Sequence, residues 1–160
     1  MFAIVITGLV NLVFTFVAIY SVDRFGRRIL MLIGSAGLAG IYAILGTGYF
    51  LQSTGIHMLL LVVLAIACYA MSLAPITWVV ISEIFPNRIR GAAMSVAVFS
   101  LWAACTVLTL TFPYLEGSLG VHGAFWLYGA ICVIGFVVIL MKLPETKGKS
   151  LEDIERELVD

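Results

Sequence analysis

The hydrophobic pattern of this chain consists of apolar runs about 20 residues long, separated by short polar segments. A run of that length is what an α-helix needs to cross the hydrocarbon core of a bilayer. We expect one membrane-spanning helix in each of five runs: 1–20, 29–51, 58–82, 92–115 and 124–141. The pattern therefore predicts an all-α transmembrane fold.

The composition supports a membrane protein. Hydrophobic residues make up 62% of the chain, and charged residues make up 11%, against roughly 25% in soluble domains. The formal net charge is zero, which argues against a nucleic-acid partner and leaves the lipid bilayer as the expected surroundings. The three cysteines are widely spaced within apolar runs, so they indicate no metal or redox motif. No cofactor loop and no nucleophile with a matching base is evident, so we do not expect an enzyme.

The basic residues predict the orientation in the membrane. All of them lie on one side of the five predicted spans: Arg24, Arg27, Arg28, Arg88, Arg90, Lys142, Lys147, Lys149 and Arg156. The positive-inside rule makes that side cytoplasmic, which places the N-terminus outside and the C-terminus inside. An odd number of spans with an external start indicates a fragment, and the upstream part should hold an odd number of spans if its own N-terminus is cytoplasmic. We expect a multi-pass protein of the cell membrane, or of the inner membrane in a Gram-negative cell.

The third predicted span carries a proline, a tryptophan and an acid near its end. Pro75 lacks a backbone N–H, so we expect the helix to kink or break there. Breaks within a membrane persist where the freed backbone is buried in protein or lines a wet cavity. Trp78 lies close to the expected break, and Glu83 ends the apolar run before Arg90. A broken helix of this kind indicates a solute pathway with a charged gate.

Two other spans carry polar or unusual residues. Asn11 shares a helix face with Thr7 and Thr15, and these side chains can bind either a hydroxyl-rich ligand or neighbouring helices. Trp102 lies in mid-membrane, where tryptophan is uncommon, and it can be a ligand contact or a packed aromatic. Both interpretations stay open for each residue.

The second span and the chain end have structural signatures. Small residues four apart in the span at 29–51 favour close helix packing. Residues 144–160 are expected to form a cytoplasmic tail with a short amphipathic helix, because Ser150 and Asp153 resemble a capping box.

Four motifs together resemble the sugar porter family of the major facilitator superfamily. They are Asp23-Arg24-x-Gly26-Arg27-Arg28, Pro75-x-x-Trp78, Ser82-Glu83-x-Phe85-Pro86-x-x-x-Arg90-Gly91 and Pro144-Glu145-Thr146-Lys147-Gly148. The resemblance implies a partial major facilitator bundle in which these spans are the eighth to twelfth of twelve. It also implies a partner, the missing N-terminal half of the same carrier.

The resemblance implies roles for individual residues. The substrate-binding residues would be Asn11, Tyr69, Trp78 and Trp102. The gating charge cluster would be Asp23, Arg24, Arg27, Arg28, Glu83 and Arg90, with Pro75 as the helix break. Three positions at which members of the family often have an acid or amide hold Ala70, Leu101 and Cys105. Their loss implies weaker binding of a polyhydroxylated ligand, or a preference for one with fewer hydroxyls facing this half.

The leading functional hypothesis is transport of a monosaccharide or polyol by alternating access, with a coupling proton as a further candidate partner. The alternative is a transport-inactive sugar sensor on the same scaffold. The short tail favours a carrier over a sensor.

Overall fold

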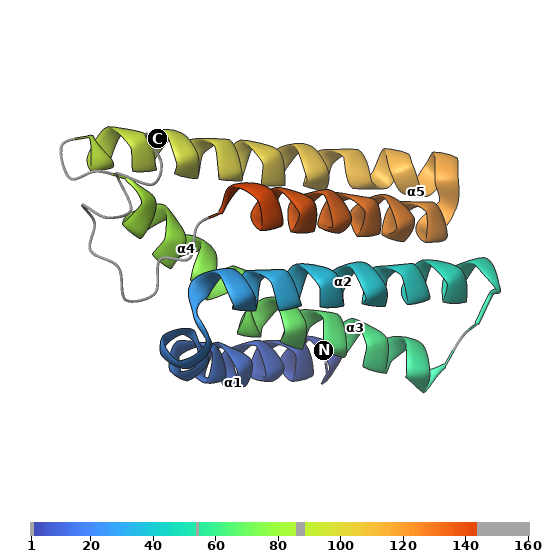
Figure 1. Cartoon of the computed structure of the whole chain (residues 1–160). Coiled ribbons are helices and arrows are strands. Elements are labelled where there is room, and N and C mark those ends of the chain that lie inside the picture. The colour runs from blue at the N-terminus through green and yellow to red at the C-terminus, as the bar shows by residue number, and fades with distance from the viewer. Residues whose placement is uncertain (1, 54, 86–88, 144–160) are drawn as a thin grey trace.

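The computed structural model describes residues 2–53, 55–85 and 89–143. Within these ranges the regular secondary structure is entirely helical, which confirms the predicted all-α class. The helices are arranged side by side in a bundle (Figure 1). Arg88 and the predicted tail at 144–160, with its amphipathic helix and the motif at 144–148, lie outside the described residues.

The first two helices are joined by a single residue. Helix α1 spans Phe2–Phe25 and α2 spans Arg27–Phe50. Between them Gly26 has φ of 92°, a conformation that side-chain-bearing residues rarely adopt. The helix of the first apolar run thus extends five residues past its predicted end at residue 20, and Gly26 turns the chain back at once.

The third apolar run forms two helices. Helix α3 spans Ile56–Met71 and α4 spans Leu73–Ile84, with Ser72 between them. The two lie in one 29-residue apolar stretch that is long enough to cross a membrane. Ser72 therefore interrupts a membrane span, and does not connect two separate spans.

Helix α5, Arg90–Lys142, contains 53 residues and folds back on itself. A straight helix of that length would be about 80 Å long, well over twice the roughly 30 Å of a bilayer core. At Gly120 the backbone is non-helical, with φ of 70° and ψ of 170°. Figure 1 shows the two arms of α5 running antiparallel on either side of this turn. The turn at Gly120 takes the place of a longer connection between the predicted spans 92–115 and 124–141.

Helix α2 lies between α5 and α3 (Figure 1) and supplies much of the buried core. One cluster joins its middle to α3 through Leu38, Ile41, Leu45, Met58 and Ala65. A second, around Val22, Leu30, Ile76 and Val80, joins α1, α2 and α4 near the Gly26 turn. Most remaining large apolar side chains are exposed, as expected for helices that face lipid or further protein.

Four helical stretches have the length and hydropathy of membrane spans, among the described residues: Val5–Val22, Arg27–Phe50, Ile56–Ile84 and Arg90–Lys142. Because the last doubles back at Gly120, the described chain can cross a bilayer five times. The protein is therefore a multi-pass membrane protein.

Candidate substrate pathway and charged gate

The interruption of the third span lies at Ser72, three residues before Pro75. The Ser72 backbone has φ of −122° and ψ of −81°, outside the helical region. In an unbroken helix Pro75 could not donate to the Met71 carbonyl, and its ring would clash with that carbonyl. A break between Met71 and Leu73 relieves both problems. It leaves Pro75 in the first turn of α4, where backbone N–H groups have no helical partner in any case.

Two of the backbone groups freed by the break find local partners. The Ser72 N–H donates to the Tyr69 carbonyl at 3.3 Å, a tightened turn of the 3₁₀ kind. The Ser72 hydroxyl donates to the Cys68 carbonyl, the group that the Ser72 N–H would bond in a regular helix. The side chain thus substitutes for the missing backbone donor, which allows the break to lie inside an apolar span.

Close packing of α2 protects the same break. A Cβ atom added at Gly34 would overlap the Ser72 side chain, so only glycine fits there. Ser72 is 2% exposed and Gly34 is buried. Gly34 thus lets α2 approach the interrupted span closely, whereas the predicted small pair Ala39 and Ala43 lies next to Gly129 of α5.

Asn11 lies on an exposed face of α1. Together with Thr7, Thr15 and Ile66 it lines an open hollow of about 670 Å³. The Thr15 hydroxyl donates to the Asn11 backbone carbonyl at 2.8 Å and lies 3.5 Å from its side-chain oxygen. The Asn11 amide can therefore offer donors toward the hollow.

Tyr69 on α3 borders a neighbouring hollow of about 220 Å³. Its other walls come from α2, α3 and α5 and include Tyr42 and Phe125. Ile66 lines both this hollow and the one beside Asn11, so the two are adjacent. The structure thus brings two of the four predicted substrate-binding residues to neighbouring hollows.

The two predicted tryptophans project from other helices. Trp78 on α4 is 46% exposed and Trp102 on the first arm of α5 is 60% exposed. Neither lines the hollows of Asn11 or Tyr69. All four predicted residues are nevertheless accessible at the surface of the described helices.

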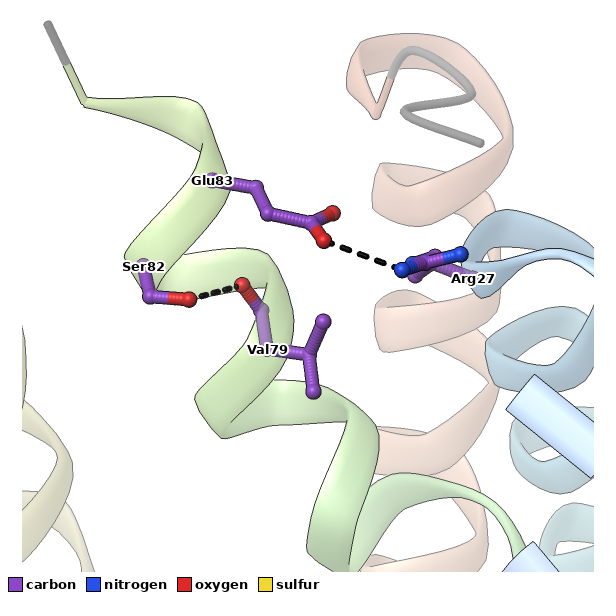
Figure 2. Close-up of polar contacts among 4 residues, drawn as sticks. All are labelled: Arg27, Val79, Ser82 and Glu83. Atoms are coloured by element: carbon purple, nitrogen blue, oxygen red, sulfur yellow. Dashed lines mark hydrogen bonds and ion pairs between the residues drawn. The ribbon is translucent and has the colours of Figure 1, made fainter. Parts of the chain in front are cut away.

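An ion pair joins the start of α2 to the end of α4. Arg27 Nη2 donates to Glu83 Oε1 at 3.1 Å, and the two side chains are 18% and 25% exposed. Figure 2 shows Glu83 reaching from α4 toward Arg27, while the neighbouring Ser82 donates to the Val79 carbonyl on its own helix. Partial burial makes this pair stronger than an exposed surface pair.

The other arginines of the predicted gating cluster have different surroundings. Arg28 Nη2 donates at 2.7 Å to the Leu140 carbonyl near the end of α5. Arg90 Nε donates to the Phe85 carbonyl at 3.3 Å. Arg24 is exposed on α1, and the described side chains do not include that of Asp23.

The Arg28 contact was not foreseen from the sequence. It satisfies one of the last carbonyls of α5, which have no helical partner, and it places a positive charge at the negative end of the helix dipole. Adjacent arginines at the start of α2 therefore reach two different helices, α4 and α5. The only sequence signal for this was the pair of basic residues directly after a turn glycine.

The described residues hold no group of three or more histidine, cysteine, aspartate or glutamate side chains suited to a metal ion. The site is built instead from an amide, aromatic rings and an ion pair. Such groups can bind a polar ligand and change partners, and they do not form a nucleophile and base.

A family model described as "Sugar (and other) transporter" matches residues 1–158. Because the match covers almost the whole chain, the chain belongs to this family, the sugar porters of the major facilitator superfamily. The family consists of transporters, which confirms the expectation that this is not an enzyme.

Individual relatives and solved structures agree with the family. The D-xylose-proton symporter of Escherichia coli K12 is 42% identical over 94% of this chain and 32% of its own length. The facilitated trehalose transporter Tret1 of Anopheles gambiae is 38% identical over 97% of this chain and 20% of its own length. The inward-open structure of the E. coli xylose transporter XylE matches with a TM-score of 0.90 and 41% identity, over 97% of this chain and 35% of that one. The chain thus spans between about a fifth and about a third of the length of these three proteins.

Proposed function

We propose that residues 1–160 are the last five spans of a twelve-span carrier that moves a monosaccharide or polyol by alternating access. Family membership along 158 residues and coverage of about a third of XylE support this proposal. The remaining spans would come from an N-terminal half of the same carrier. The basic residues support a cytoplasmic C-terminus, and the family supports a place in the cell membrane.

One structural observation carries the proposal. Asn11 is exposed in a helix that is otherwise apolar enough to span a membrane. An amide facing lipid without partners is costly, so this face of α1 is expected to meet a polar ligand or another part of the carrier. The hollow beside Asn11, which shares the wall residue Ile66 with that of Tyr69, is the proposed position of the sugar.

The aromatic residues would contact the sugar in a different way. A sugar ring has apolar C–H faces as well as hydroxyl groups, and an indole ring can cover such a face with a large contact area. Trp78 and Trp102 are exposed enough to do so once the other half of the carrier closes the cavity. We infer that the amide of Asn11 and the rings of Tyr69, Trp78 and Trp102 together bind the substrate.

The ion pair between Arg27 and Glu83 is the proposed cytoplasmic latch. It ties the start of α2 to the end of α4, which is the helix that carries Pro75 and Trp78. Breaking the pair would remove the charged contact between the end of α4 and α2 and leave only their apolar packing. A contact present in one state and absent in the other biases the two populations by its differential free energy.

The names of the relatives guide the choice of substrates. One relative is a D-xylose-proton symporter and another a facilitated trehalose transporter. D-xylose, D-glucose, myo-inositol and trehalose are therefore the first ligands to test, with and without a proton gradient. We favour a monosaccharide or polyol with a moderate number of hydroxyls, because Ala70, Leu101 and Cys105 offer this half few hydrogen-bond partners.

Uptake into proteoliposomes tests the proposal. The full polypeptide that carries residues 1–160 would be reconstituted, and uptake of each radiolabelled sugar measured against its L-enantiomer, or against mannitol for myo-inositol. The proposal expects saturable and stereospecific uptake of at least one sugar. Stereospecific binding without uptake would favour a sensor, and absence of both binding and uptake would contradict the proposal.

A further inference from the structure

A small cavity lies beside the helix interruption, on the side of α1 and α2. Its volume is about 150 Å³, and its walls include Phe25 of α1, Ile33 and Gly34 of α2, Cys68 of α3, and Ser72. Neither Asn11 nor Tyr69 lines it, so it is separate from the proposed sugar site. No role in the proposed transport step uses it.

Two of the three polar side chains in the cavity wall, those of Cys68 and Ser72, are bonded within the protein, and Ser21 is the third. The Ser72 hydroxyl donates to the Cys68 carbonyl, and the Cys68 thiol lies 3.7 Å from the Gly34 carbonyl that accepts from it. A buried water needs two to four polar partners, and this wall has little to offer one. The cavity is therefore suited to an apolar occupant.

The size of the cavity limits that occupant. Engineered protein cavities of about 150 Å³ with apolar walls stay dry and bind benzene or xenon. A whole lipid acyl chain is several times larger than benzene. The methyl end of a lipid acyl chain is thin enough to enter, but it lies at the bilayer centre. Phe25 in the cavity wall lies instead next to the Gly26 turn and its flanking arginines. These arginines mark the membrane surface.

The mouth of the cavity opens toward the surroundings of the helices. Phe25 is 57% exposed and Ile33 is 56% exposed, while Gly34 and Ser72 behind them are buried. Both exposed residues lie on apolar helices near their membrane-surface ends. A molecule dissolved in the outer part of the hydrocarbon layer can therefore enter between α1 and α2 without crossing water.

We propose that this cavity binds one compact, neutral hydrocarbon of about the size of benzene, taken up from the bilayer. The occupant would contact α1, α2 and Ser72 together. It would therefore fill the space into which the interrupted span could otherwise relax. The proposal does not depend on sugar transport.

Photolabelling with phenyldiazirine tests the proposal in the full polypeptide held in lipid nanodiscs. Adducts would be located by peptide mass spectrometry, with p-xylene as competitor. Labelling of the peptide containing Cys68 and Met71 should saturate with probe concentration. It should fall about ten-fold when p-xylene is present at ten times its dissociation constant, by mass action. Labelling around Ile134, which is 63% exposed on α5 and lines none of the hollows described above, should rise linearly and ignore p-xylene.

Matched variants on one helix provide the control. Ile33→Phe places extra bulk in the cavity mouth, whereas Ile44→Phe makes the same change on α2 at a residue that is also 56% exposed and does not line the cavity. Ile33→Phe should abolish saturable labelling and Ile44→Phe should keep it. If Ile33→Phe does not fold, Ser21→Leu fills the cavity from α1 instead.

Three results would overturn the proposal. One is labelling near Cys68 that never saturates, and another is saturable labelling that survives both filling variants. The third is saturable labelling that appears only after lipid has been stripped in detergent, because a lipid chain would then be the resident occupant.

Discussion

Neutralising Glu83 is the sharpest test of the proposed latch. Arg27 Nη2 and Glu83 Oε1 are 3.1 Å apart. At an effective dielectric constant of 20, two unit charges at that distance attract by about 5 kcal/mol. Desolvation and side-chain ordering offset most of this attraction. Hydrogen bonds to charged groups are worth about 1.5–3 kcal/mol net, and partial exposure of both side chains lowers the value for this pair to about 1–2 kcal/mol.

That free energy sets the size of the expected effect. If the pair forms only when the cytoplasmic gate is closed, its loss shifts the ratio of closed to inward-open molecules by about 5- to 30-fold. Glu83→Gln keeps the size of the side chain and removes its charge, so it should produce this shift toward inward-open. Glu116→Gln makes the same change at an exposed position near the Gly120 turn and should leave the ratio unchanged.

Distance measurements between spin labels can report the ratio in the full-length carrier. The free cysteines Cys68, Cys105 and Cys132 would first be replaced. One label would be placed at exposed Ala92, near the start of α5, and the other on the cytoplasmic end of the opposite half. The inward-open population then appears as a long-distance peak.

A double-mutant cycle excludes an indirect effect. In an Arg27→Gln background, Glu83→Gln should cause little further shift, because the partner charge is already absent. An unchanged inward-open fraction in Glu83→Gln, with the fold intact, would refute the latch. An equal shift with and without Arg27 would show that Glu83 acts through another group.

Two further predictions concern packing within the described helices. Arg28→Met should lower the free energy of unfolding by about 1–2 kcal/mol, because it removes the charged donor to the Leu140 carbonyl. Arg28→Lys keeps the charge and should lower that free energy less. Equal thermal stability of Arg28→Met and wild type in nanodiscs would contradict the capping role. Gly34→Ala should destabilise the protein because its Cβ would overlap Ser72, whereas Gly40→Ala on the same helix meets open space and should be neutral or stabilising by up to about 1 kcal/mol. Equal effects of the two alanines in the same melting assay would contradict the close approach of α2 to the break.

The fold class was predictable because it follows from long apolar runs alone. A bilayer leaves few options for a backbone that must satisfy its own hydrogen bonds, so run length is enough to predict helices. The details of the turns were less accessible. A glycine at position 26 permits a tight turn, but the apolar pattern did not indicate that this one residue would join α1 to α2. It also did not indicate that Gly120 would take the place of a loop, because each turn depends on one residue with positive φ.

The candidate site was predictable where it depends on chemistry within one helix, and the family motifs also grouped Arg27 with Glu83, which lies on another helix. The pairing of Asn11 with Thr15 follows from their four-residue spacing. The position of the break at Ser72 instead of Pro75 depends on the Ser72 hydroxyl and on Gly34 of another helix, which no local pattern reveals. The Arg28 contact with Leu140 joins residues far apart in sequence and could not be read from either segment.

Calorimetric titration of sugar against Trp78→Ala tests the central claim, that this chain contributes side chains to the sugar site of a carrier. The full-length protein would be titrated with the sugar for which the uptake assay gives a saturable signal, and each dissociation constant would be referred to the folded fraction. Trp126→Ala is the matched control, because Trp126 is 44% exposed against 46% for Trp78 and packs on Phe50 and His122 instead.

If the indole of Trp78 contributes at least about 1.4 kcal/mol to binding, Trp78→Ala should weaken sugar binding about ten-fold or more. Trp126→Ala should reduce stability and leave the dissociation constant unchanged. A dissociation constant for Trp78→Ala equal to that of wild type would remove Trp78 from the substrate site and contradict the account of how this chain binds sugar.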